Sequence, residues 1–247
     1  MPARSWFTDW FDSHYYHLLY QHRDEGEALG FIDTLISHLQ PSPGARMADI
    51  ACGKGRHAKV LADMGFDVTG IDLSTSSIAR AKIYESGNLH FYQHDMRLPF
   101  WINYFDYAFN FFTSFGYFRT RREHDNAIRT IAQSLKQQGI FVIDYLNVHY
   151  EEDRLQRSAT CDVENVHFLI SKWQDEEHFF KQIQVTDQAN PTPKHLYTER
   201  VAKFSLGDFT DMLSYQGMQV QEVFGGYDLE HYDIRHSPRM IIVARKK

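Results

Sequence analysis

The chain has 247 residues, a formal net charge of -6 at pH 7, and 43% hydrophobic and 15% aromatic residues. This length predicts one α/β domain with a modest addition. The negative charge gives no general attraction to nucleic acid or to an anionic membrane surface. The two cysteines, Cys52 and Cys161, form no disulfide framework, the fourteen histidines show no metal-ligand spacing, and no secretory segment opens the sequence. We therefore expect a cytoplasmic protein without a metal.

The sequence begins with a region rich in aromatic residues. Their spacing of three and four predicts one amphipathic helix from Ser5 to Gln21. Asp9 and Asp12 stand where a membrane-surface helix would carry Lys or Arg, so we expect this helix to pack on protein rather than on a membrane. A second helix is predicted from Glu25 to Leu39, ended by the proline-containing turn at 41–44.

The stretch from Arg46 to Ser74 has the pattern strand, glycine turn, helix, strand. Residues 47–52 are nearly all apolar and predict a buried strand, and Gly53 and Gly55 follow it. A helix is predicted over 56–64, and a second strand over 66–71 ends at Asp72. This pattern is half of a doubly wound α/β sheet, in which ligands bind at the carboxyl ends of the strands.

Two classes of cofactor compete for this turn. The run from Gly53 to Ala58 fits the dinucleotide pattern GxGxxA, and Asp72 lies near the position of its ribose-binding acid. Asp49, four residues before Gly53, would repel a pyrophosphate but attract the ammonium and sulfonium groups of S-adenosylmethionine (SAM). The turn therefore favours SAM, with a nicotinamide dinucleotide as the alternative.

These residues make the chain resemble the class I SAM-dependent methyltransferases. The first motif of that family corresponds to Asp49, Ala51, Gly53 and Gly55, with alanine in place of the usual first glycine. The resemblance implies that Asp72 binds the ribose hydroxyls with Leu73 against the adenine, and that Asp95 accepts from the adenine amino group with Met96 on the ring. We also place Arg56 and His57, which follow the second glycine, in the cofactor site.

The following elements agree with this family. We expect a helix from a cap at Ser74 or Thr75 through Tyr84, strands at 89–93, 105–112 and 140–147, and a helix running through Lys136. The end of the fourth strand faces the methyl group in this fold, so the resemblance implies that Asn110 contacts the methionine part and that Tyr117 contacts the substrate.

The segment 150–204 interrupts the alternation of strands and helices. It contains three runs with strand character, at 163–173, 178–186 and 197–204, and we interpret it as an inserted antiparallel β cap for the substrate or for a dimer contact. A helix at 207–215 and strands at 218–224 and 240–244 follow. We therefore expect a Rossmann-like sheet, mostly parallel with an antiparallel last strand, formed by 1–149 and 205–247.

The sequence indicates the substrate-binding residues less clearly than the cofactor-binding ones. N-terminal helices close over the cofactor in similar methyltransferases, so the resemblance implies that Tyr15, Tyr16 or Tyr20 forms part of a lid. We take Tyr16, Tyr117, Tyr227 and Arg239 as candidate substrate contacts. The candidates for a general base are Tyr117, Asp144, Tyr145, His149 and His236. None of them stands out by its spacing, so the catalytic residue stays unassigned.

The sequence as a whole predicts methyl transfer from SAM to an unidentified small molecule, by an enzyme similar to a bacterial subgroup of the family. A SAM-binding regulatory or partner subunit without turnover is the alternative, and an NAD-dependent oxidoreductase is a weaker one. We expect no nucleic-acid or membrane partner. A homodimer is possible.

Overall fold

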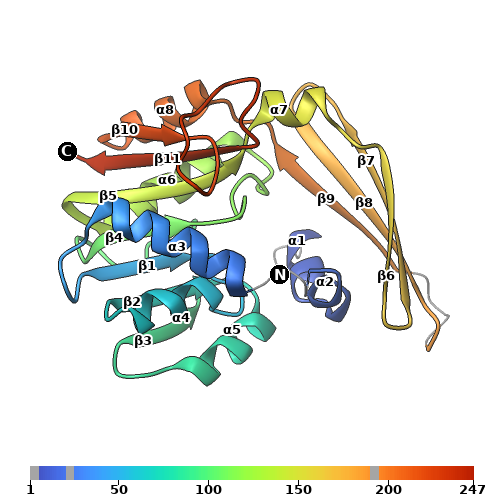
Figure 1. Cartoon of the computed structure of the whole chain (residues 1–247), viewed down its shortest axis with the longest axis horizontal. Helices are drawn as coiled ribbons and strands as arrows, with labels where there is room; N and C mark the ends of the chain where they lie inside the picture. Colours follow the sequence, from blue (N-terminus) through green and yellow to red (C-terminus); the bar gives the residue numbers. More distant parts are fainter. Residues whose placement is uncertain (1–5, 21–24, 190–194) are drawn as a thin grey trace.

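The computed structural model describes residues 6–20, 25–189 and 195–247. It contains two separate sheets, one of seven strands and one of four (Figure 1). We call the seven-stranded sheet and its covering helices the body, and the four-stranded sheet the cap.

The body has the expected Rossmann-like architecture. Its strands are β1 (Arg46–Ile50), β2 (Asp67–Asp72), β3 (Leu89–Gln93), β4 (Phe105–Asn110), β5 (Leu135–Leu146), β10 (Met218–Phe224) and β11 (Arg239–Lys246). Their order is β10-β11-β5-β4-β1-β2-β3. The last strand, β11, is antiparallel to both of its neighbours, whereas β1 to β5 pair in parallel. The predicted fold class is therefore confirmed.

Helices cover both faces of this sheet because its strands are apolar on both sides. On one face lie α3 (Glu25–Leu39), α4 (Arg56–Asp63) and α5 (Thr75–Ala81), which bury Phe31, Leu61 and Ile78 in one core cluster. On the other lie α6 (Arg121–Ser134) and α8 (Leu206–Tyr215), which bury Ile128 and Phe209 in a second (Figure 1). The carboxyl ends of the parallel strands stay uncovered by these helices.

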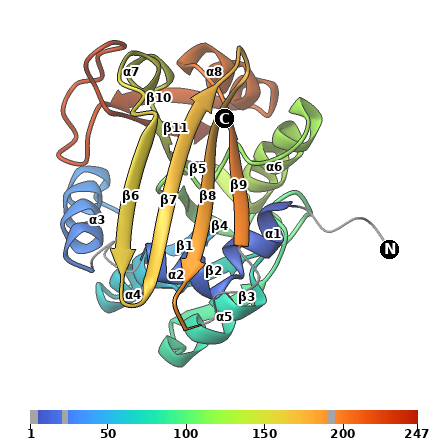
Figure 2. The same ribbon diagram turned by 90° about the vertical axis from the view of Figure 1, so that its right-hand side faces the viewer.

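The cap lies across those strand ends (Figure 2). It consists of β6 (Ser158–Val163), β7 (Val166–Gln174), β8 (His178–Asp187) and β9 (His195–Ala202), each antiparallel to the next. The prediction of three strands was wrong, because β6 was missed. This edge strand has the sequence SATCDV, whose only large apolar residue is its last one, so no apolar run marks it.

A pair of short helices fills the space between body and cap (Figure 1). They are α1 (Trp6–Phe11) and α2 (His14–Leu19), so the prediction of one continuous helix was wrong, while both of its predicted ends lie outside the described residues. The break occurs at Ser13, whose side chain accepts a hydrogen bond from the Tyr16 backbone N–H at 3.1 Å and caps α2. Serine favours such a cap because its short side chain satisfies an otherwise unpaired helix amide.

Further elements differ from the prediction. Lys136, expected in a helix, lies in β5, because α6 ends at Ser134 and the strand begins at Leu135. The fourth strand ends at Asn110 rather than Phe112, because Phe112 and Thr113 have φ values of 55° and 56° that no strand contains. A short helix, α7 (Val148–Asp153), follows β5 and leads into the cap without having been predicted. None of the helices in the described part of the chain is long and apolar enough to cross a membrane.

Candidate functional site

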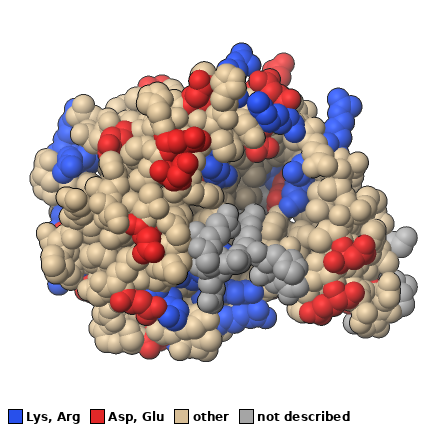
Figure 3. Space-filling model, in the orientation of Figure 1, with Lys and Arg blue, Asp and Glu red and all other residues tan. Residues whose placement is uncertain are grey.

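A cavity of about 580 Å³ lies where the strand ends, the two N-terminal helices and the cap meet. Figure 3 shows the surface hollowed between body and cap, with Lys and Arg side chains at its margins. Its volume is in the range of small-molecule sites. Its lining includes Ala51, Gly53, Asp72, Leu73, Asp95 and Met96 from the body, Tyr16 and Tyr20 from α2, and Lys172, Lys181 and Glu199 from the cap. Residues predicted for the cofactor and for the substrate thus share one cavity.

The turn after β1 forms one wall of the cavity. Ala51, Gly53 and Gly55 have φ values of 62°, 57° and 82°, so the backbone turns sharply toward α4. A Cβ on Gly53 would meet no atom within 4 Å, whereas one on Gly55 would lie 2.5 Å from the Phe91 ring. Gly53 therefore leaves open space for a ligand, and Gly55 permits close packing of the turn on β3.

Asp72 lies at the end of β2 and lines the cavity. Its Oδ2 accepts a hydrogen bond from the Gly53 backbone N–H at 2.9 Å, and its Oδ1 accepts one from the Ser74 backbone N–H at 2.8 Å. Burial raises the pKa of this carboxyl above its ordinary value. The two amides fix the carboxylate, and each oxygen keeps a lone pair for a ligand hydroxyl.

Two buried acceptors lie close behind the same wall. Asp49 is 1% exposed on β1, Asn110 is 0% exposed at the end of β4, and neither lines the cavity. Among the described residues, Asp49 Oδ2 and Asn110 Oδ1 have no hydrogen-bond partner. Burial and the nearby Asp72 raise the pKa of Asp49 to about 7. Such unsatisfied acceptors favour a cationic ligand, which fits the methionine part of SAM.

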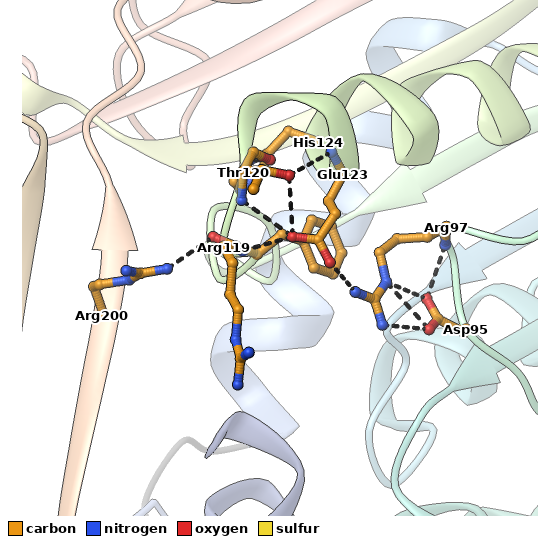
Figure 4. A network of polar contacts seen from close by, with 8 residues as sticks. Asp95, Arg97, Arg119, Thr120, Glu123, His124 and Arg200 are labelled. Carbon is orange, nitrogen blue, oxygen red and sulfur yellow. Dashed lines mark hydrogen bonds and ion pairs between the residues drawn. The ribbon is translucent and has the colours of Figure 1, made fainter. Parts of the chain in front are cut away.

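Asp95 is held in a network of charges at the end of β3 (Figure 4). The Arg97 guanidinium donates to both of its oxygens, at 3.0 Å to Oδ1 and 2.7 Å to Oδ2, and also to Glu123 Oε1 at 2.5 Å. Glu123 in turn completes the capping box of α6 with Thr120. The hydrogen bonds from Arg97 hold the pKa of Asp95 below its ordinary value despite burial. Asp95 is therefore a fixed anion at the cavity wall, and its bond to adenine stays a prediction.

The remaining cofactor candidates lie in different places. Leu73 and Met96 line the cavity and pack against the core, as an adenine site requires. Arg56 and His57 do not line it. His57 is 8% exposed and stacks on Phe112 with ring centroids 5.1 Å apart, while burial and the Arg56 charge lower its pKa to about 3. A contact of these two residues with the cofactor is untested.

The four candidate substrate residues, Tyr16, Tyr117, Tyr227 and Arg239, all line the cavity. Arg239, on β11, donates through Nε to Asp144 Oδ1 at 2.7 Å and through Nη2 to Thr113 Oγ1 at 2.9 Å. Asp144, 0% exposed, also accepts from the Phe112 backbone N–H at 2.8 Å and the Tyr227 hydroxyl at 3.2 Å. This buried carboxylate thus organises the loop after β4 through its ion pair with the cavity-lining Arg239.

Of the five candidate bases, Tyr117 lines the cavity and the other four do not. Asp144 already accepts hydrogen bonds from Arg239, the Phe112 backbone and Tyr227. Tyr145 donates its hydroxyl to the Ala202 carbonyl, and burial raises its pKa above the ordinary value. His149 and His236 lie near Glu152 and Asp233, with His236 exposed. The geometry therefore leaves Tyr117 as the candidate base within the cavity.

Helices α1 and α2 form hydrogen bonds with both the body and the cap. Asp12 Oδ1 accepts from the Ser74 hydroxyl at 2.7 Å and the Ser76 backbone N–H at 3.0 Å, at the start of α5. On the cap side, the Trp10 indole N–H donates to Glu199 Oε1 at 2.6 Å. Helices α1 and α2 therefore wall the cavity between the expected ribose site and the cap.

Sequence reasoning missed the cap residues Lys172, Lys181 and Glu199. Their strands were predicted, but their common position follows from the pairing register, which a single sequence does not reveal. Among the described residues, no group of three or more His, Cys, Asp and Glu side chains is placed to hold a metal ion.

The strand order, the antiparallel β11, the glycine turn and the carboxylate that ends β2 define the class I SAM-dependent methyltransferase fold. Comparison with known proteins agrees. A family profile described as a methyltransferase domain matches residues 47–139. The putative methyltransferase YqeM of Bacillus subtilis is 35% identical over 102 residues, a match that spans 40% of this chain and 41% of YqeM. The putative methyltransferase GWCH70_2453 of a Geobacillus strain is 24% identical over 229 residues, spanning 87% of this chain and 90% of that protein.

Solved structures share the whole fold. The CcbJ methyltransferase from Streptomyces caelestis has a TM-score of 0.78 at 18% identity, covering 97% of this chain and 98% of CcbJ. SAM-bound CalS10, an amino pentose methyltransferase from Micromonospora echinaspora, has a TM-score of 0.70 at 19% identity, covering 95% of this chain and 98% of CalS10. Residues 47–139 therefore match a methyltransferase-domain family, and the chain has the fold of the SAM-dependent methyltransferases.

Proposed function

We propose that this protein transfers the methyl group of SAM to a small-molecule acceptor bound beneath the cap. The observation that carries the proposal is a single cavity whose lining runs from Asp72 and Asp95 at the strand ends to Lys172 and Glu199 on the cap. A cofactor held at the strand ends and an acceptor held under the cap would then be side by side, which is the arrangement that direct transfer needs.

The residues of the strand ends are assigned to the cofactor. Asp72 would accept from the ribose hydroxyls, and Leu73, Asp95 and Met96 would surround the adenine. Ala51 and Gly53 would lie against the methionine part, with the charge of Asp49 and the amide oxygen of Asn110 behind them. When bound, SAM supplies a methyl group activated by its sulfonium.

The chain would contribute mainly position and exclusion of water. The two N-terminal helices and the cap line the cavity, so they would hold the acceptor near the methyl group and shield it from part of the solvent. If the acceptor must lose a proton, Tyr117 in the cavity wall is the candidate to receive it, as the phenolate formed when its own proton has passed to solvent. Because CalS10 is described as an amino pentose methyltransferase, amino sugars belong in the first acceptor screen.

The first test is a calorimetric titration with SAM, S-adenosylhomocysteine and NAD(H). We expect micromolar binding of the first two, about -8 kcal/mol, and no binding of NAD(H). Asp49→Asn should weaken SAM by about tenfold, because a charged partner of the cation is lost without a change in shape. Unchanged SAM affinity in this variant would refute the role of Asp49, and NAD(H) binding alone would refute the proposal. SAM binding without acceptor-dependent release of S-adenosylhomocysteine across the screen would favour a regulatory subunit.

SAM binding should also depend on pH. With a pKa of about 7 in the free protein, Asp49 is mostly protonated at pH 5.5 and half ionised at pH 7. Only the ionised carboxylate attracts a cation, so with the tenfold effect of Asp49→Asn at pH 7 the affinity should rise about sixfold over this interval. Titration of the parent and of Asp49→Asn at both pH values measures this effect. Equal pH dependence in the two proteins would show that another group is responsible.

A further inference from the structure

A row of three charged residues crosses the inner face of the cap. In the strand register, Lys172 on β7 lies directly opposite Lys181 on β8, which lies directly opposite Glu199 on β9. All three line the cavity. Two ammonium groups and one carboxylate therefore stand side by side on the wall that faces the strand ends.

The carboxylate is already engaged. Glu199 is 8% exposed, and its Oε1 accepts from the Trp10 indole at 2.6 Å and from the Tyr20 hydroxyl at 3.1 Å. Its Oε2 lies 3.8 Å from the Lys181 ammonium, which also donates to the Tyr20 hydroxyl and lies 4.6 Å from the centre of the Tyr20 ring. Glu199 and Tyr20 thus satisfy Lys181.

The charge of Lys172, in contrast, is not paired in this way. The structure gives its side chain no hydrogen bond or ion pair with any of the described residues, although its backbone N–H donates to the Arg157 carbonyl at 2.8 Å. Glu151, on α7, also lines the cavity, and no ion pair joins it to Lys172. Like charges directly opposite in an antiparallel pair destabilise the sheet. This repulsion is stronger beside a cavity than in open water.

We propose that Lys172, supported by Lys181, binds a carboxylate or phosphate group of the methyl acceptor. The inference rests on the proposed function, because it assigns the cap wall of the cavity to the acceptor. An anion bound next to Lys172 supplies a negative charge, which Lys172 lacks because its partner across the strands is another lysine. It also anchors one end of the acceptor while the other end lies near the strand ends. The acceptor is therefore an anionic small molecule.

The test uses inorganic pyrophosphate and succinate as separate probes for phosphate and carboxylate. Each is titrated calorimetrically into the full protein, free and saturated with S-adenosylhomocysteine. We expect the parent to bind at least one probe, Lys172→Gln to lose tenfold or more of that affinity, and Lys172→Arg to retain it. Lys82→Gln, at an exposed lysine on the body outside the cavity, is the matched control and should bind as the parent does.

Thermal unfolding provides a second signature. Without a probe, Lys172→Gln should unfold about 1–2 °C higher than the parent, because a repulsion is removed. The bound probe should raise the unfolding temperature of the parent by more than that of Lys172→Gln at the same probe concentration. A fold damaged by the substitution would instead show a lower temperature without any probe.

Three results would overturn the proposal. The parent binds neither probe, with or without S-adenosylhomocysteine, or Lys172→Gln binds the probes as tightly as the parent. Alternatively, Lys172→Gln weakens S-adenosylhomocysteine but not 5′-methylthioadenosine, which lacks the amino-acid part, and Lys172 then binds the carboxylate of the cofactor. Failure of the parent to bind S-adenosylhomocysteine would count against the proposed function separately, since the probe titrations of the free protein still report on Lys172.

Discussion

Asp144→Ala is expected to lower the free energy of unfolding by about 3 kcal/mol, because it leaves the Arg239 guanidinium, which is partly exposed to the cavity, without its counter-charge. Asp144 is 0% exposed and lies 2.6 Å from Arg239 Nη2. The Phe112 backbone N–H and the Tyr227 hydroxyl would lose their acceptor as well. Chemical denaturation followed by circular dichroism measures the loss. The loop after β4 should loosen with it, so SAM binding should also weaken.

The matched control removes a carboxylate from an exposed ion pair. Glu222 lies 2.9 Å from His38 Nε2, and both side chains are more than a third exposed. Glu222→Ala should therefore change stability by less than about 1 kcal/mol. Replacing Arg239 by Met in the Asp144→Ala background should recover part of the loss, since it removes the unpaired charge. A loss below 1 kcal/mol in Asp144→Ala would show that the pair does not organise this loop.

Asp72→Ala is expected to weaken SAM and S-adenosylhomocysteine alike, by about 100-fold. The variant loses two charge-assisted hydrogen bonds to the ribose, at roughly 1.5 kcal/mol each. Both ligands carry the same ribose, so the two affinities should fall together. The Gly53 and Ser74 amides that now donate to Asp72 would lose their acceptor too, which adds to the effect. Calorimetric titration with each ligand measures the change.

Asp67→Ala is the control for this substitution. Asp67 is the first residue of the same strand, its carboxylate lies 3.6 Å from Arg46, and it does not line the cavity. Cofactor affinity should be unchanged in this variant. Equal affinities of parent and Asp72→Ala for both ligands would remove Asp72 from the cofactor site. A selective loss of SAM alone would place the carboxylate near the sulfonium instead of the ribose.

Much of the body could be predicted because its signals are local. The apolar strands, the glycines at 53 and 55 and the apolar face of α3 each specify structure within a few residues, and the bounds Glu25–Leu39 and Leu89–Gln93 agree with the prediction. The prediction failed where the secondary structure depends on polar residues instead of on an apolar pattern. Ser13 divides one amphipathic pattern into two helices, and β6 forms at a sheet edge from residues with almost no apolar pattern.

In the site, too, the sequence predicts the position of some residues but not the contacts that they make. Asp72, Leu73, Asp95 and Met96 each follow a predicted strand, so their position at the cavity could be expected from the family resemblance. The partners that decide what each residue can do are distant in sequence. Asp144, a candidate base, is engaged by Arg239, 95 residues away, and the register that places Lys172 beside Lys181 follows from the pairing of β7 with β8. A sequence pattern contains no information on such pairs.

The contact between Trp10 and Glu199 spans 189 residues of chain. Its loop can close only after β9 has joined the cap, and closing a loop of this length is slow compared with forming the local turns of the body. We therefore expect helix α1 to be among the last elements to reach its final place during folding. Trp10, 1% exposed in the finished structure, would stay solvated until then. In a variant whose other three tryptophans are replaced by Phe, quenching of Trp10 fluorescence by a water-soluble quencher would follow the final stage of refolding.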